Sequence, residues 1–285
     1  MIWEKKGVIF SVPNNRAQSP TAILLGRIIR IYYSSRIDGK SRIFYIDVDA
    51  ETLRVTDRRP VLVLSPGEPG SFDENGCVPG SVVHTEDGYI SLFYTGFAAG
   101  QNGNAYSLNV CQANSTDGGE TFTKSAMPLI AGDEEKCYIA ASPYGFMKDD
   151  ELRLFYSVGT GWYEGSPVYK MNFGGFFNYD NQESTARPAI VKIGEKYCMW
   201  FSRRYSVDFR GGIGSYRIGY AEISDEFDGW QRDDSEAGID VGEAGEFDDS
   251  MIAYPSIVRV KDRLIMFYSG NGFGETGIGC AVCEL

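Results

Sequence analysis

Two short stretches of the chain place acidic residues just before an apolar run. They read GSFDENGCVPGS at residues 70–81 and GEFDDSMIAYPS at residues 245–256. In each, a Phe is followed by two acids, of which Asp73 and Asp248 come first, and a proline lies a few residues further on. Neighbouring carboxyl groups can act as general acid, general base or nucleophile. A structural repeat would also produce two such stretches, so the elements around them have to be considered.

Both stretches precede copies of a pattern that occurs five times in the chain. Each copy has a proline near its start, a short apolar run, a polar turn and an aromatic-rich run that ends in Ser or Thr. Alternating strands around a turn of this kind predict a β-hairpin. The five copies are SPTAILLGRIIRIYYS (19–34), VPGSVVHTEDGYISLFYT (78–95), SPYGFMKDDELRLFYS (142–157), RPAIVKIGEKYCMWFS (187–202) and YPSIVRVKDRLIMFYS (254–269).

The hairpins predict an all-β protein, a five-bladed β-propeller that forms one domain over residues 1–285. A third alternating strand usually follows each hairpin, and a repeating block of this length is typical of propeller blades. Short segments at 122–124 and 230–232 fit fourth, outer strands in two blades. The last blade has no such segment after it, but the chain begins with the similar Ile-Trp-Glu-Lys at 2–5. We therefore expect the N-terminal strand to join the last blade and close the ring, which removes an exposed sheet edge.

The amino-acid composition and charge exclude some classes of binding partner. The net charge of −12 argues against nucleic acid and anionic membranes, which need a basic surface. No apolar run is long enough to span a membrane. The N-terminus lacks the pattern of a signal peptide, so we expect a cytoplasmic protein. A small molecule or an oligosaccharide is the expected ligand, and no protein partner is evident from the sequence.

Cofactors and metals are not expected either. The chain has one histidine, His84, which excludes a metal site built on several imidazoles and leaves a Ser-His-Asp triad without a well-placed base. The six cysteines show no disulfide framework, and Cys280 and Cys283 lie in one predicted strand, where they point to opposite faces. No glycine-rich segment has the strand and helix context of a nucleotide-binding motif.

In a propeller, the residues just before each innermost strand converge on a central funnel. Carboxylates, arginines and aromatic rings gathered there suit a carbohydrate, because they bind hydroxyls and stack on sugar rings. For any single acid, capping a turn or pairing with an arginine is the more frequent role. The predicted catalytic residues are Asp73, Glu135 and Asp248, and the predicted substrate-binding residues are Gln18, Arg36, Trp162, Glu183, Arg187, Arg203, Tyr254 and Asn271.

Ser115, Asp117 and the glycines after it, in STDGGETF at 115–122, fit the Asp box of propeller glycosidases. We expect this box to be a tight turn, so Asp117 is not a catalytic candidate. With the five repeats and the acids before the strands, the chain resembles the five-bladed glycoside hydrolases of families 43, 32 and 130. It is most similar to a bacterial subset that occurs among surface-polysaccharide genes. The stretches that carry this likeness are 35–36, 41–43, 72–73, 186–188, 216–222 and 268–274.

The resemblance implies a carbohydrate-active enzyme, a glycosidase working through Asp or Glu acid–base chemistry. Asp73 or Glu135 would be the general acid and Asp248 would position a hydroxyl or the attacking water. Families 43 and 32 place an Asp before the first blade, but this chain has NNRAQSP at 14–20, with no carboxylate. Two alternatives therefore stay open. One is a phosphorylase, in which Arg36, Arg187 or Arg203 would hold phosphate, and the other is a sugar-binding propeller without catalysis.

Overall fold

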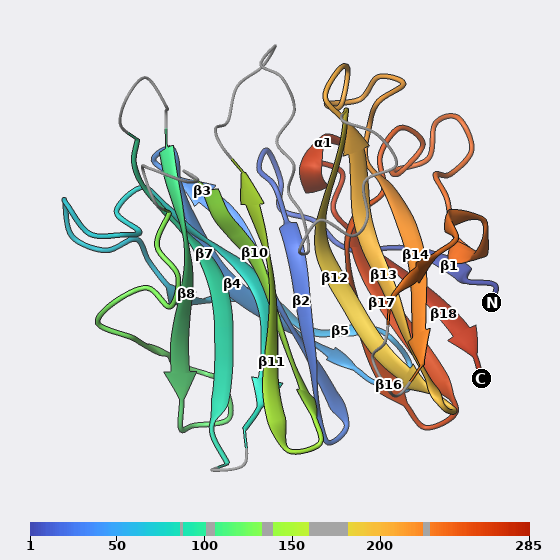
Figure 1. The fold of residues 1–285 in the computed structure, drawn as a ribbon, viewed down its shortest axis with the longest axis horizontal. Helices are drawn as coiled ribbons and strands as arrows, with labels where there is room; N and C mark the ends of the chain where they lie inside the picture. Colours follow the sequence, from blue (N-terminus) through green and yellow to red (C-terminus); the bar gives the residue numbers. More distant parts are fainter. Residues whose placement is uncertain (86–87, 101–105, 133–138, 160–181, 225–228) are drawn as a thin grey trace.

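The structure is a computed structural model of the whole chain, and it describes all residues except 86–87, 101–105, 133–138, 160–181 and 225–228 (Figure 1). The described residues form β-structure almost throughout. The exceptions are a 3-10 helix η1 (Asp234–Ala237) and a short α1 (Asn271–Gly274). Neither is long and apolar enough to cross a membrane, and the described residues contain no other helix.

Strand pairing groups the described strands into five antiparallel units, numbered here from 1 to 5. Each contains one of the predicted hairpins, which the pairings confirm. Unit 1 holds β2 (Gln18–Leu25), β3 (Ile28–Ile37), β4 (Lys40–Asp49) and β5 (Val55–Leu64), and unit 2 holds β6 (Gly76–His84), β7 (Ile90–Ala99), β8 (Tyr106–Ser115) and β9 (Thr123–Lys124). Unit 3 holds β10 (Ile139–Lys148) and β11 (Glu151–Gly159), and unit 4 holds β12 (Glu183–Ile193), β13 (Lys196–Tyr205), β14 (Arg217–Ser224) and β15 (Gln231–Arg232).

Unit 5 combines the two ends of the chain. It holds β16 (Ala253–Val260), β17 (Arg263–Ser269) and β18 (Ile278–Glu284), and β1 (Glu4–Phe10) pairs antiparallel with β18 as its fourth strand. The expected partner of the N-terminal strand is thus observed, and Figure 1 shows both termini on the same side of the molecule. Just before β1, the ring of Trp3 packs edge-on against Trp200 of unit 4, with centroids 5.3 Å apart.

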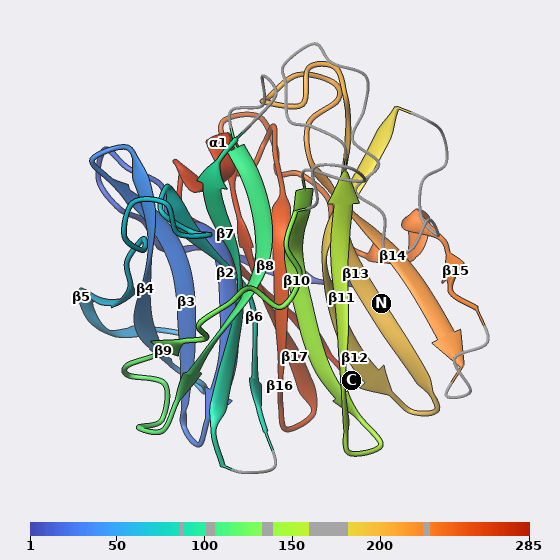
Figure 2. The same ribbon diagram turned by 60° about the vertical axis from the view of Figure 1, so that its left-hand side comes forward.

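The first strands of the five units lie side by side in the middle of the molecule (Figure 2). Each first strand contacts the first strand of the next unit, in the order β2, β6, β10, β12 and β16. β16 in turn contacts β2. Single parallel residue pairs also join β4 to β6 and β8 to β10, so that units 1 to 3 form one curled sheet.

In three of the repeats, the Ser or Thr that ends the pattern accepts a hydrogen bond from the neighbouring unit, whereas Ser34 bonds to Gln18 in its own unit. The hydroxyl oxygen of Thr95 accepts a hydrogen bond from the backbone N–H of Ser142 at 2.9 Å. Ser202 accepts in the same way from Tyr254 at 2.7 Å, and Ser269 from Ser19 at 3.1 Å. Each bond joins the second strand of one unit to the first strand of the next. This use of the hydroxyl explains why the pattern ends in Ser or Thr, because a buried N–H needs an acceptor.

The hydrophobic core lies between the units as well as within them. One cluster joins units 1 and 5 through side chains that include Ile31, Tyr33 and Phe267, and another joins units 4 and 5 through Trp200 and Tyr268. All five of these side chains are at most 1% exposed. Sheets that pack face to face in this way bury the aromatic residues of the repeats.

The predicted turn at the Asp box is present after β8. The carboxylate of Asp117 accepts hydrogen bonds from the Ser115 hydroxyl at 2.6 Å and the Thr121 N–H at 3.0 Å. These bonds hold the pKa of Asp117 well below its usual value. Gly118 and Gly119 have positive φ values of 77° and 82°, which glycine adopts without steric cost.

Candidate functional site

The backbone is distorted at the same place in four of the five units. Ser19, Ser142, Arg187 and Tyr254 each stand directly before the proline of their repeat, with φ values between 53° and 61°. The pairing register of each of these strands shifts at the same point. A non-glycine residue in this conformation costs of order 1–3 kcal/mol, and such strain concentrates at functional sites. Val78, at the equivalent place in unit 2, does not have a positive φ.

These five residues line a single cavity of about 70 Å³, called here the central cavity. It lies where the first strands converge, as the sequence predicts for the funnel. Its wall is partly polar, and among the described residues that line it there is no carboxylate. The remaining lining residues are Gln18, Thr95, Phe97, Leu108, Ala141, Ala186 and Tyr216, with Val78 completing the set from unit 2.

Arg187 crosses the middle of the molecule. Its side chain extends from unit 4 and donates to the backbone oxygens of Pro79 and Pro20, the latter at 3.1 Å, and to Thr21 Oγ1 at 3.0 Å. The residue is only 4% exposed, and burial lowers the pKa of its guanidinium to about 10. Arg187 therefore stays positively charged at neutral pH, although no carboxylate contacts it among the residues that the structure describes.

Two tyrosines lie beside Arg187 on the wall of the cavity, and a second arginine, Arg204, contacts one of them from behind the lining. The rings of Tyr216 and Tyr254 lie 5.4 Å apart, and the Arg187 guanidinium is 5.5 Å from the centre of the Tyr254 ring. Arg204 donates from Nε to the Tyr216 hydroxyl at 3.1 Å and stacks 4.2 Å from the centre of the Phe209 ring. Burial raises the pKa of the Tyr254 hydroxyl well above its usual value, so this hydroxyl stays neutral.

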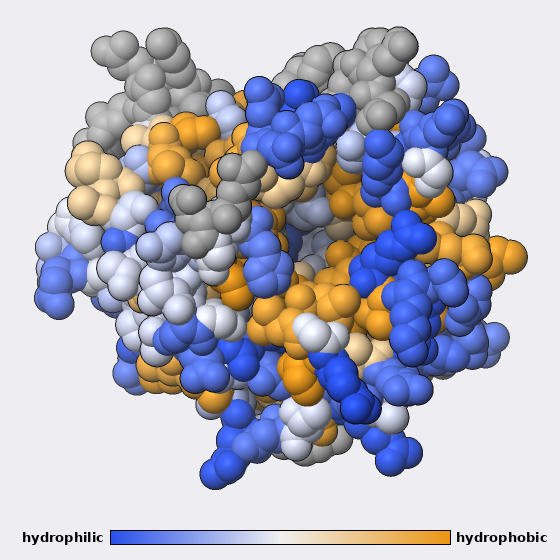
Figure 3. Space-filling view, turned by 90° about the horizontal axis from the view of Figure 1, so that it is seen from below, coloured by the Kyte–Doolittle hydropathy of each residue, from blue (hydrophilic) through white to orange (hydrophobic). Residues whose placement is uncertain are grey.

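A second, larger cavity of about 310 Å³ opens on the opposite side of Arg187. It is lined by the residues that follow the prolines, and Figure 3 shows apolar side chains around the hollow on this side. Its wall combines apolar side chains such as Ile23 and Val82 with polar ones such as His84 and Arg259, but it contains none of the four strained pre-proline residues.

Asp73 does not line the central cavity. It is 1% exposed and lies inside unit 2, where its Oδ2 accepts from the Tyr94 hydroxyl at 2.9 Å and forms an ion pair with Lys124 at 2.5 Å. Its Oδ1 accepts from the Gly67 N–H at 3.1 Å. Both oxygens are thus used to join the start of the first strand to the second strand and to the outer strand β9. These contacts give Asp73 a packing role, and a catalytic role stays a prediction that they do not support.

Asp248 is held in the same way in unit 5. It is fully buried, with Oδ2 accepting from the Tyr268 hydroxyl at 3.0 Å and pairing with Lys5 at 2.9 Å. Glu183 completes a set of three, because it is 1% exposed and forms a two-armed ion pair with Arg232 of β15, both bonds being 2.7 Å long. We call each set of acid, outer-strand base and neighbouring ring a blade cluster; in unit 4 the ring is that of Phe201.

The second acids of the two opening stretches stabilise a turn. Glu74 accepts from the N–H of Gly70 at 2.7 Å, and Asp249 accepts from the N–H of Gly245, also at 2.7 Å. Bonds to backbone N–H groups lower the pKa of both carboxyls. The two stretches therefore share the bond from the second acid to a glycine N–H and the bond from the first acid to a tyrosine hydroxyl, and a repeated turn explains these shared bonds.

Gln18, Arg187 and Tyr254 are the predicted binding residues that line the central cavity. Arg36 is exposed on β3, and Arg203 forms an ion pair with Asp234 at 2.9 Å. Asn271 accepts from the N–H groups of Ser250 and Met251 at 3.0 and 2.9 Å and so fixes a loop. Glu135 and Trp162 lie outside the described residues, and the roles predicted for all of these residues stay predictions.

The prediction omitted Ser142, Thr95 and Tyr216, three polar residues of the cavity wall. The repeats contained a signal for the first two, since Ser142 precedes a repeat proline and Thr95 is a repeat-ending hydroxyl. Tyr216 begins the stretch YRIGYAE, which contributed to the family likeness, but its ring reaches the cavity from the loop before β14, which no strand pattern indicates.

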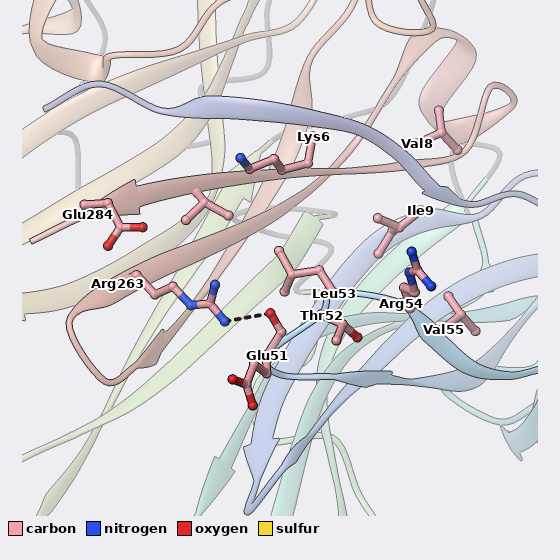
Figure 4. A pocket seen from close by; sticks show the side chains of 11 residues that line it. Lys6, Val8, Ile9, Glu51, Thr52, Leu53, Arg54, Val55, Arg263 and Glu284 are labelled. Carbon is pink, nitrogen blue, oxygen red and sulfur yellow. Dashed lines mark hydrogen bonds between the residues drawn. The ribbon is translucent and has the colours of Figure 1, made fainter.

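Two larger grooves lie away from the centre. One, of about 600 Å³, separates β1 from the turn after β4 (Figure 4). There Arg263 donates hydrogen bonds to the backbone oxygens of Ala50 and Glu51 at 2.7 and 3.1 Å. Its guanidinium therefore links units 5 and 1. The other, of about 650 Å³, lies beside β8 and includes Met127 and Pro128. Neither groove is formed by equivalent residues from several units. Within the described ranges, no group of three metal-ligating side chains comes together.

Comparisons with known proteins agree with this architecture. The scan against family models found no match. Two proteins of Mycobacterium tuberculosis strains, the uncharacterized proteins MT1551 and Rv1502, are each 29% identical over 313 residues, covering 100% of both chains.

Solved structures are similar over almost the whole chain. A glycoside hydrolase gives a TM-score of 0.72 at 14% identity, covering 100% of this chain and 92% of its own. An α-L-arabinofuranosidase from Podospora anserina gives 0.61 at 14% identity, covering 99% and 95%. A structure from the family of mannoside phosphorylases that contains β-1,2-mannoside hydrolases gives 0.63 at 15% identity, covering 99% and 93%. The chain therefore has the fold of the propeller glycoside hydrolases and phosphorylases.

Proposed function

We propose that the five units are the blades of a closed five-bladed propeller, and that the protein is a glycoside hydrolase whose glycan binds at the central cavity. The observation that carries this proposal is the convergence of the five pre-proline residues on one partly polar cavity. Carbohydrate-active enzymes with this fold support it. The ring of contacts from β2 around to β16 and back supports closure.

The binding groups of such a site are on the wall of the cavity. Amide and hydroxyl groups of Gln18, Ser19 and Ser142 suit the hydroxyls of a sugar, and the rings of Tyr216 and Tyr254 suit its C–H faces. The pre-proline strain fits this role, because a fixed backbone positions ligand groups before binding.

Acid–base chemistry requires a carboxyl group near the ligand. Among the predicted acids, Asp73 and Asp248 are enclosed in blade clusters, whereas Glu135 precedes β10 by only four residues. We propose Glu135 as the general acid. Glu135 itself lies outside the described residues, so the support for this choice is its place in the sequence, seven residues before Ser142 of the cavity wall.

Parallel measurement of turnover and stability tests this assignment. Oligosaccharides from bacterial surface polysaccharides are incubated with the protein, and products are followed by mass spectrometry. We expect Glu135→Gln to lower kcat by about 10²–10⁴-fold at unchanged Tm, since that is the usual contribution of a general acid. We expect Asp73→Asn and Asp248→Asn to lower Tm instead. Full turnover by the Glu135→Gln variant would refute the catalytic role of Glu135.

A phosphorylase is the second candidate, and the buried Arg187 without a carboxylate favours it. Phosphate would then replace water as the nucleophile. Cleavage that requires inorganic phosphate and yields a sugar phosphate would establish this reaction. A third candidate, a sugar-binding propeller without catalysis, is favoured by the lack of a carboxylate among the described lining residues; saturable binding without any product would identify it.

A further inference from the structure

We propose that the ligand of the central cavity carries an anionic group, the carboxylate of a sugar acid or a phosphate ester, and that Arg204 and Arg187 recognise it. The inference rests on the proposed function, since it names the class of sugar. Its support is independent of the fold comparisons and comes from how this chain distributes its buried charges.

Elsewhere in the chain, buried arginines have carboxylate partners. Arg30 is 7% exposed and forms two hydrogen bonds of 2.8 Å with Asp47. Arg232 is paired with Glu183 and also with Asp234, at 2.7 Å each. Burying a guanidinium costs free energy, and a nearby carboxylate offsets that cost. In both of these cases, the positive charge of a buried arginine is paired with a carboxylate of this protein.

Two other buried arginines have no such partner, namely Arg187, which lines the central cavity, and Arg204, which contacts the lining residue Tyr216. Arg187 and Arg204 are 4% and 8% exposed, yet no carboxylate contacts either one among the residues that the structure describes. Arg187 donates to oxygens of uncharged groups, and its buried Nε has no acceptor. A protein with a net charge of −12 has many acids that could have supplied a partner. The missing negative charge is therefore the feature that a ligand would provide.

Arg204 has the geometry of a binding group. Its Nε–H is directed to the Tyr216 hydroxyl and its Nη1 to the Tyr205 backbone oxygen at 3.1 Å, while the guanidinium plane packs on Phe209. These contacts hold the guanidinium of Arg204 in place without using all five of its N–H groups. A carboxylate or a phosphate accepts two parallel bonds from such a fork.

More positive charge surrounds the same aromatic group. Arg210 lies 5.0 Å from the centre of the Phe209 ring and 5.8 Å from that of Phe273. Arg16 lies 5.7 Å from the centre of the Phe273 ring, but its charge is paired with Glu275 at 2.6 Å. Phe273 packs edge-on against Tyr216, whose ring lines the cavity. In an acidic protein, arginines and rings gathered at one place would attract an anion toward the cavity while the rings contact its sugar.

Calorimetric binding of matched probes tests the proposal on the full chain. The probes are glucuronate and galacturonate, their neutral counterparts glucose and galactose, glucose 1-phosphate, and inorganic phosphate. We expect at least one anionic sugar to bind about tenfold or more tightly than its neutral counterpart, because charge-assisted hydrogen bonds are stronger. Arg204→Gln should remove this preference and Arg204→Lys should keep part of it. The control is Arg30→Gln, which alters a buried arginine outside the cavity and should leave the preference intact.

Each outcome decides between the two proposals. Equal affinity for neutral and acidic sugars would overturn the anionic group and leave the sugar site standing. Binding of inorganic phosphate alone, lost in Arg204→Gln, would support the anion site and contradict the sugar function. Absence of binding by every probe would count against both. A preference that survives in Arg204→Gln would overturn the role of Arg204, and Arg187→Met, compared at equal folded fraction, then tests Arg187 alone. If the affinity for a uronate depends on Arg204, the recognised group is a carboxylate. If the affinity for glucose 1-phosphate depends on it, the group is a phosphate.

Discussion

The interior of the units and the central cavity treat buried charge in opposite ways. In the blade clusters of units 2, 4 and 5, an acid before or at the start of the first strand meets a base on the outer strand, as Asp73 meets Lys124. At and beside the central cavity, Arg187 and Arg204 are also buried but meet only uncharged groups within the described part of the chain. The paired charges hold strands together, whereas the unpaired ones are the groups that we propose bind a ligand.

This difference changes how the repeated acids are interpreted. Acids at equivalent places in several repeats suggest a ring of catalytic groups, but three of them satisfy the same internal contact. What varies between units is the residue directly before the proline, which is Ser, Val, Ser, Arg and Tyr in units 1 to 5. Variation at one place within a regular scaffold is how repeat folds build a specific site.

Removing an acid from a blade cluster should have the largest effect. Asp73→Ala leaves the ammonium of Lys124 and the hydroxyl of Tyr94 without their partner. Breaking a buried pair costs about 3–5 kcal/mol, and the partial exposure of Lys124 places the expected loss of unfolding free energy at the lower end. Denaturant unfolding measures this loss.

The control for this prediction is Asp57→Ala, which breaks an exposed pair with Arg59 and should change stability little. If Asp73→Ala proved as stable as this control while losing turnover, Asp73 would belong to the site after all, and the contrast between the two regions would fail.

The second prediction concerns buried groups that must stay neutral. Burial raises the pKa of the Cys280 thiol, in unit 5, to about 12. The folded state then binds more protons than the unfolded state between pH 9 and 12. This contribution to stability is complete below pH 9 and is lost as the pH rises through that window. From pH 9 to 10 we expect a loss of about 1 kcal/mol.

Unfolding free energies of the wild type and of Cys280→Ala, measured at pH 8, 9, 10 and 11, test this prediction. The variant should show a smaller alkaline loss than the wild type. Identical pH profiles would mean that the thiol is not held neutral by its surroundings.

The smallest effect is expected at the strained residues of the cavity. Ser142→Gly removes a side chain from a position with φ of 53°, and glycine adopts this conformation without steric cost. We expect stability to stay the same or to rise by less than about 1 kcal/mol. Val78→Gly, at the equivalent place without a positive φ, should lower it. Thermal unfolding of the two variants side by side would show whether the strain is local to the pre-proline residues.

Much of the fold could be predicted from the sequence because it rests on local patterns. The hairpins follow from alternation and turns, and the pairing of β1 with β18 followed from the likeness of residues 2–5 to the outer strands of other units. The Asp box specified its own turn through Asp117.

The candidate site was harder to predict, because the direction and the burial of each side chain decide which residues face the cavity. The sequence placed Asp73 and Asp248 before the first strands but gave no indication that their side chains lie within the units. The partners of Asp248 show why, since Lys5 is at the other end of the chain. Arg187 was identified by its place before a proline. The sequence also placed Arg204 beside Arg203 near the end of a second strand, but gave no indication of its contact with Tyr216.

The pairing of β1 with β18 also sets an order for folding. β1 and its partner β18 are separated by almost the whole sequence, so unit 5 forms only when the residues between them are available. Units 1 and 2 are continuous in sequence and can form earlier, since their contacts are local by comparison. Until then Trp3, which ends up against Trp200, has no place to be buried. We therefore expect the last folding step to be the one that brings the two ends of the chain together.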